Sequence, residues 1–94
     1  MEVDEPAADL GVAAAIISSF RNVQIPPETA VFGEIGLTGE IRGVLQAQAR
    51  AREAQTLGFK KLILPESNKK GLEKLLGIRV VGVRNLEDAM DELF

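Results

Sequence analysis

The chain contains no histidine, cysteine, tyrosine or tryptophan, and its only aromatic residues are four phenylalanines. The missing histidine and cysteine exclude Ser-His-Asp and Cys-His nucleophile systems and most transition-metal sites. Without cysteine there is no disulfide framework, which fits a reducing compartment. Without tyrosine and tryptophan, the better stacking platforms for single-stranded nucleic acid are also missing.

Long apolar runs are absent as well. The best candidate, residues 10–17, is less than half of the roughly 18 residues that a bilayer span requires. The N-terminus is acidic, whereas the start of a signal peptide is basic. We therefore expect a cytoplasmic protein that makes no contact with a membrane.

The composition is that of one globular domain, with 46% hydrophobic and 27% charged residues among 94. The net charge of −3 conceals a segregation along the chain. Residues 1–40 carry seven acids and one base, residues 41–84 carry ten bases and three acids, and residues 85–94 carry four acids. A basic middle segment of this kind fits either a nucleic-acid surface or the solvated faces of two helices.

An acidic cluster precedes a helix predicted over residues 6–20. Pro6 suits the first helical turn, and Asp4, Glu5 and Asp9 lie near the positive end of the helix dipole. The same carboxylates could hold a hard cation such as Mg²⁺, but the sequence supplies no further ligands for it. Their favourable interaction with the helix dipole is therefore the preferred interpretation. Apolar residues occur on every face, which predicts a central helix buried on several sides.

The rest of the chain alternates strands and helices. Residues 29–37 and 40–44 are predicted to be two strands joined at Thr38-Gly39. Residues 45–57 form a predicted helix with a small-residue face, stopped by Gly58. The elements that follow are a strand at 61–65, a helix at 67–76 capped by Ser67 and closed by Gly77, a strand at 78–83, and a helix at 86–93 capped by Asn85.

This order from residue 45 onward is typical of βαβ units, in which parallel strands are joined by right-handed helical crossovers. The predicted fold class is therefore α/β, with a mixed or mostly parallel sheet and packed helices.

Three stretches carry a resemblance to a known family: DEPAADLGVAAAIISSF, VFGEIGLTGEIRGV and AREAQTLGFKKLILPESN. Together they resemble the C-terminal half of the protease-like domain of the bacterial RadA (Sms) DNA-repair ATPases. That domain is similar to the proteolytic domain of the Lon proteases. The resemblance implies a Lon-protease-like fold, also described as ribosomal S5 domain 2-like. It further implies that residues 1–94 form one partial domain, without its N-terminal half and without an upstream ATPase.

The resemblance also implies that a Ser-Lys catalytic dyad has been lost. In Lon the motif D-G-P-S-A-G carries the nucleophilic serine, and Ala7 stands at that position here. The catalytic lysine position falls on Arg50, counted back from Gly58. Alanine has no nucleophilic atom, and arginine stays charged and cannot accept a proton from serine.

Arg50 is expected to pair with an acid instead. The helical pattern places it at the border of the small-residue face of residues 45–57, and Asp4, Glu5 and Asp9 are the candidate partners. If the pair is partly buried, an uncharged residue at position 50 costs about 1–3 kcal/mol.

By resemblance, the parent protein carries a zinc-binding segment and a RecA-like ATPase that acts in homologous recombination. ATP, Mg and Zn would belong to those parts, and no cofactor or metal is expected in this chain. The protease-like domain would help to build a hexameric ring and contact DNA, so we expect self-association. Charge segregation alone selects the candidate DNA-contacting residues, Arg42, Arg52, Lys60, Lys61, Lys69 and Lys70.

Two other functions remain open. One is a stand-alone α/β oligomerisation module that does not bind DNA. The other is a working Ser-Lys peptidase of Lon type, for which residue 7 is the discriminating position.

Overall fold

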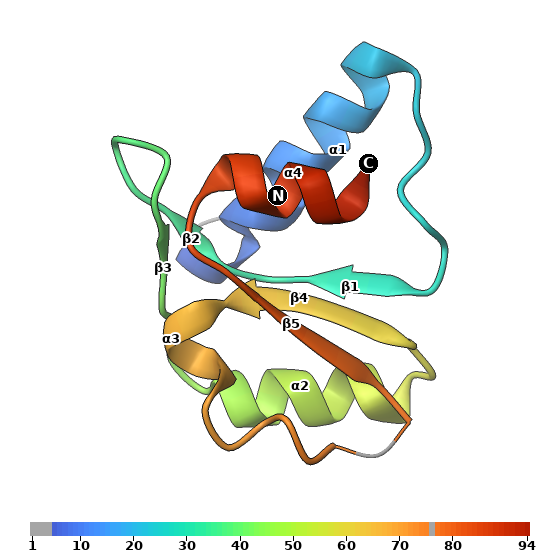
Figure 1. Ribbon diagram of the computed structural model, residues 1–94, viewed down its shortest axis with the longest axis vertical. Coiled ribbons are helices and arrows are strands. Elements are labelled where there is room, and N and C mark those ends of the chain that lie inside the picture. The colour runs from blue at the N-terminus through green and yellow to red at the C-terminus, as the bar shows by residue number, and fades with distance from the viewer. Residues whose placement is uncertain (1–4, 76) are drawn as a thin grey trace.

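A computed structural model describes residues 5–75 and 77–94 (Figure 1). The helices and strands occur in this order: η1 (Pro6–Ala8), α1 (Asp9–Arg21), β1 (Thr29–Val31), β2 (Glu34–Ile35), β3 (Ile41–Arg42), α2 (Ala47–Thr56), β4 (Lys61–Pro65), α3 (Glu66–Lys69), β5 (Arg79–Val83) and α4 (Leu86–Leu93).

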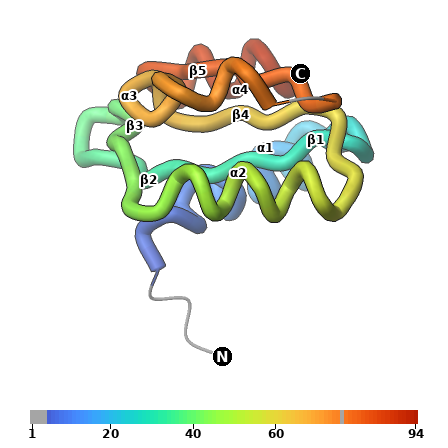
Figure 2. Tube along the Cα trace, turned by 90° about the horizontal axis from the view of Figure 1, so that it is seen from below, coloured from blue at the N-terminus to red at the C-terminus, as the bar shows by residue number. Residues whose placement is uncertain are grey.

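A three-stranded parallel sheet in the order β1-β4-β5 lies at the centre of the fold. Helix α2 lies on one side of this sheet, and α1 and α4 lie on the other (Figure 1). Figure 2, taken from the α2 side, shows that helix in front of the strands. The strands β2 and β3 form a separate antiparallel pair. The predicted α/β class with a mostly parallel sheet is confirmed.

The central strand β4 contributes to a hydrophobic core on each face of the sheet. Ile63 packs in the core beneath α1 and α4, whereas Leu62 and Leu64 pack in the core beneath α2. All three side chains are fully buried. This alternation follows from the two-residue period of a strand, and it explains why the sequence of β4 has no polar interruption.

Helix α1 is covered on one face only. Leu10 and Ala14 are buried, but Val12, Ile16 and Phe20 are exposed, and Phe20 is 90% exposed. The prediction that this helix is buried on several sides is therefore wrong for the described chain. The reason is its position at the margin of the sheet, where its outer side faces no other described element.

The predicted first strand, residues 29–37, is in fact two short strands. Strand β1 joins the parallel sheet, and the chain then leaves the sheet to form β2, which pairs with β3 across a turn that contains Thr38-Gly39. Within this turn the Glu40 carboxylate accepts hydrogen bonds from the Thr38 amide at 3.0 Å and from the Thr38 hydroxyl at 2.8 Å. A Cβ at Gly36 would lie 2.2 Å from the carboxyl carbon of Glu40, so a larger residue there would displace this carboxylate from its hydrogen bonds.

The predicted helix at 67–76 is wrong in both of its ends. Helix α3 covers only Glu66–Lys69, and Ser67 makes no capping hydrogen bond. Lys70 leaves the helical conformation, and Gly71 has a φ of +87°, which favours glycine and ends the segment. Turns follow through residue 74, and the predicted end at Leu76 lies outside the described residues.

Helix α4 agrees with the sequence, whereas α2 agrees in part: it covers Ala47–Thr56 within the predicted 45–57, and Leu57, expected on its small-residue face, is 68% exposed. Ala47, Ala51 and Ala54 are buried along α2, and Gly58 ends the helix with a φ of +90°. Helix α4 begins at the predicted cap, where the Asn85 side chain accepts a hydrogen bond from the Asp88 amide at 2.8 Å. None of the described helices has the length and apolar character needed to cross a membrane.

Candidate functional site

A cleft of about 280 Å³ separates the start of the chain from the loop that leads into α2. Ala7 and Arg50, the two positions that the Lon resemblance assigns to a dyad, both line this cleft. Its lining consists of Glu5, Pro6, Ala7, Glu34, Gly43, Val44, Leu45 and Arg50.

The backbone fixes Ala7 at the carboxyl end of β1. The Gly33 amide donates to the Ala7 carbonyl oxygen at 2.9 Å, and the Leu10 amide donates to the Gly33 carbonyl oxygen at 3.0 Å. The Ala7 residue is only 5% exposed. Residue 7 is therefore held rigidly at the wall of the cleft, and its side chain is a methyl group.

Arg50 reaches the same cleft from the first half of α2. Its Nε donates to the Leu45 carbonyl oxygen at 3.2 Å, and its guanidinium forms an ion pair with the Glu5 carboxylate. The side chains of Arg50 and Glu5 are 32% and 54% exposed. The expected acidic partner is therefore Glu5, and the pair is more exposed than the sequence suggested.

The other two acids of the cluster do not pair with Arg50 in the described chain. The Asp9 carboxylate accepts a hydrogen bond from the Ile35 amide at 3.1 Å, which ties the start of α1 to β2. Asp4 lies outside the described residues. Among residues 5–75 and 77–94, no group of three or more acidic side chains is placed to hold a metal ion.

The described residues that line the cleft include no hydroxyl and no amine. The hydroxyl groups that do form hydrogen bonds have partners elsewhere. Ser18 donates to the Val23 carbonyl oxygen, and Thr38 donates to Glu40. Among the described residues, therefore, no hydrogen bond joins a serine or threonine hydroxyl to a lysine amine.

Asn68 supports the opposite wall of the cleft and was missed in the sequence. Its side-chain oxygen accepts a hydrogen bond from the Val44 amide at 2.7 Å, and its side-chain nitrogen donates to the Val44 carbonyl oxygen at 3.2 Å. The amide thus pairs with Val44 as a neighbouring strand would. No local spacing predicts this contact, because 24 residues separate the two positions.

Close packing at Gly43 completes this wall. A Cβ on Gly43 would lie 2.7 Å from the Ser67 hydroxyl oxygen, so a larger residue at position 43 would require the Ser67 side chain to move.

The six candidate DNA-contacting residues do not form one patch. Lys60 and Lys61 lie at the amino end of β4, whereas Lys69 and Lys70 follow its carboxyl end. Arg52 lies on the exposed side of α2 and Arg42 on β3. A five-residue strand separates the two lysine pairs by roughly 13–16 Å.

Two of these six side chains already have acidic partners. The Arg42 guanidinium lies 3.1 Å from the Glu40 carboxylate, and the Lys61 ammonium lies 3.1 Å from the Glu92 carboxylate. Within the described residues, Arg52, Lys60, Lys69 and Lys70 take part in no ion pair.

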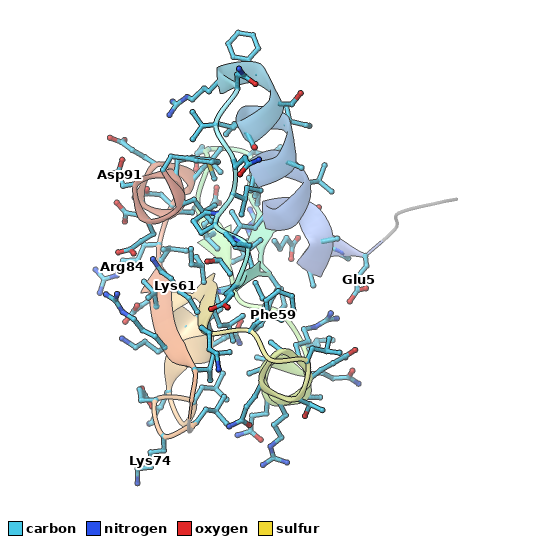
Figure 3. The ribbon with its side chains drawn as sticks, turned by 90° about the vertical axis from the view of Figure 1, so that its right-hand side faces the viewer. Glu5, Phe59, Lys61, Lys74, Arg84 and Asp91 are labelled. Atoms are coloured by element: carbon cyan, nitrogen blue, oxygen red, sulfur yellow. The ribbon has the colours of Figure 1, made fainter. Side chains whose placement is uncertain are left out.

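Further basic residues that the charge argument did not select lie near β5. Arg79 is opposite Lys61 in the register of β4 and β5. Figure 3 places Lys61, Lys74 and Arg84 on the side of the molecule where β5 lies, away from Glu5. The parallel register is the signal that links Arg79 to Lys61, and it is visible only after folding.

Comparison with known proteins identifies the family of this chain. Residues 4–68 match the family model described as "ChlI: Subunit ChlI of Mg-chelatase". Since the match covers more than half of the chain, the chain belongs to this family.

Individual relatives give a more specific likeness. The chain is 47% identical over 91 residues to DNA repair protein RadA of Halalkalibacterium halodurans, which covers 97% of the chain and 20% of that relative. It is 44% identical over 90 residues to DNA repair protein RadA of Bacillus subtilis (strain 168), and this match covers 96% of the chain and 20% of that relative. It is 40% identical over 94 residues to DNA repair protein RadA of Aquifex aeolicus (strain VF5), and this match covers 100% of the chain and 20% of that relative.

The predicted resemblance to RadA is thereby confirmed. The chain spans about a fifth of the length of these curated relatives. The similarity to the Lon proteolytic domain rests on the motif positions Ala7 and Arg50, and it stays a prediction.

Proposed function

We propose that this chain is a non-catalytic, protease-like domain of a DNA-repair ATPase, and that it serves assembly and DNA contact. The identity of 40–47% to proteins named DNA repair protein RadA over nearly the whole chain is the observation that carries this proposal. The ATPase, with its nucleotide and metal ions, would belong to the remaining four-fifths of such a protein.

The chemistry of the cleft supports the non-catalytic part. A Ser-Lys hydrolase needs an attacking oxygen and an amine that can lose its proton. The cleft offers the methyl group of Ala7 and the guanidinium of Arg50, which keeps its charge at any relevant pH. That guanidinium is paired with the Glu5 carboxylate.

An assay with unfolded casein tests this part directly. We expect no cleavage by the purified chain over hours, at concentrations where a Lon-type protease degrades the substrate. Cleavage that survives repurification, and that is lost when Arg50→Ala is introduced, would overturn the non-catalytic assignment.

The charge distribution supports the DNA-contact part. Ten bases lie within residues 41–84, and Lys69 and Lys70 form no ion pair with an acid in the part of the chain that the structure describes. Lysines of this kind would bind phosphate without reading sequence, so affinity should fall steeply with salt.

A salt titration with duplex and single-stranded DNA tests the contact and its location. Removing Lys69 and Lys70 together by alanine substitution should reduce the slope of log affinity against log salt by about 1 for each lysine that touches phosphate. Arg21→Ala is the matched control, because Arg21 lies in the acidic segment. Absence of binding at low salt would contradict DNA contact and leave the assembly role alone.

A stand-alone oligomerisation module is the second candidate. The exposed apolar side chains of α1 favour it, because faces of this kind are usually covered by a partner. The salt titration distinguishes the two candidates, since only the first predicts salt-dependent binding.

A further inference from the structure

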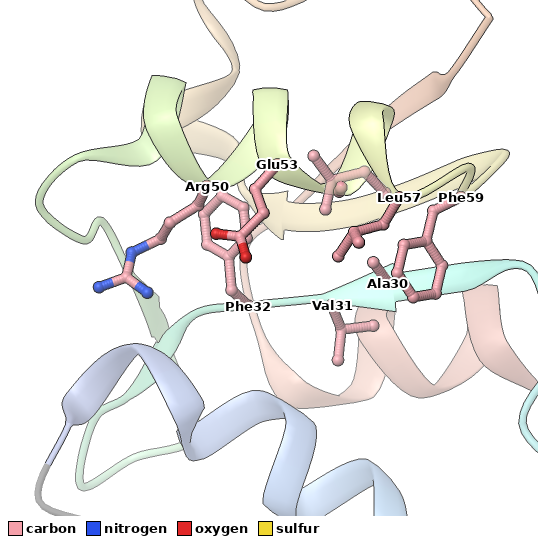
Figure 4. A pocket seen from close by; sticks show the side chains of 9 residues that line it. Ala30, Val31, Phe32, Arg50, Glu53, Leu57 and Phe59 are labelled. Carbon is pink, nitrogen blue, oxygen red and sulfur yellow. The ribbon is translucent and has the colours of Figure 1, made fainter.

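We draw no further inference here: the strongest candidate, the hollow of about 210 Å³ between β1 and α2 (Figure 4) together with the exposed apolar face of α1, carries nothing, because nothing in the structure shows whether a second copy of this chain or the rest of a longer protein covers it.

Discussion

The guanidinium of Arg50 and the carboxylate of Glu5 form an ion pair across one cleft, although 45 residues separate them in the sequence. The pair joins α2 to the residue that precedes η1. The Lon resemblance expects the catalytic lysine at position 50. Arg50 stands there instead, and its guanidinium makes a structural contact with Glu5.

Replacing Arg50 by glutamine should lower the free energy of unfolding by about 0–1 kcal/mol, because both side chains are partly exposed to solvent. This is less than the 1–3 kcal/mol expected for a partly buried pair. Urea unfolding of the variant measures the difference. Arg52→Gln removes an equal charge from the same helix and serves as control, and equal effects of the two variants would show that the Glu5 contact contributes nothing.

Restoring only one half of a dyad should not restore activity. Ala7→Ser introduces a hydroxyl into the cleft, but Arg50 remains charged and cannot accept its proton. We expect the variant to leave casein intact at all pH values between 6 and about 9. Arg50→Lys alone, which supplies an amine without a nucleophile, is the parallel control. Cleavage by Ala7→Ser would mean that another group acts as the base.

The hydrogen bonds in the β2–β3 turn lower the pKa of Glu40 from 4.5 to about 2, chiefly through the Thr38 side chain and then through backbone amides and Arg42. Because the folded pKa lies below the unfolded one, the ionised carboxylate stabilises the fold above pH 4.5. That contribution is lost as the pH falls from 4.5 towards about 2.

Unfolding of Glu40→Gln at a series of pH values measures this contribution. The stability difference from the parent chain should be constant above pH 4.5 and should shrink as the pH falls towards about 2. Glu28→Gln removes an exposed carboxylate at another position and controls for net charge. A difference that does not change over this range would contradict the assignment.

Truncating Asn68 should destabilise the domain more than the loss of an exposed amide. Asn68→Ala removes both hydrogen bonds to Val44, which corresponds to about 1–3 kcal/mol. Gln24→Ala, in the exposed loop between α1 and β1, is the matched control. Asn68→Asp keeps the acceptor for the Val44 amide and removes the donor to the Val44 carbonyl oxygen, so any stability that it retains measures the first bond alone.

The sequence predicted those elements whose limits are marked by local chemistry. Asn85 caps α4, Gly58 ends α2, and the unbroken apolar run at 61–65 is the central strand. In each case one residue or a short run determines the conformation by itself. Helix α3 is shorter than predicted because the chain already leaves the helical conformation at Lys70, well before the expected closing residue Gly77.

The parts that could not be predicted depend on pairs far apart in the chain. The choice of Glu5 over Asp9 as the partner of Arg50 arises because Asp9 is occupied by the Ile35 amide. The support of Val44 by Asn68 and the pairing of Lys61 with Glu92 have the same character. Periodicity places a residue on a face, but only the folded chain determines which distant group lies opposite it.

Strand β4 has a consequence for how the domain opens. Its side chains enter the packing on both faces of the sheet, and both neighbouring strands pair with it. Neither of the two hydrophobic cores can unfold while the other stays folded, because both depend on side chains of β4. The slowest amide to exchange should therefore be that of Ile63, and one cooperative transition should govern the whole described chain.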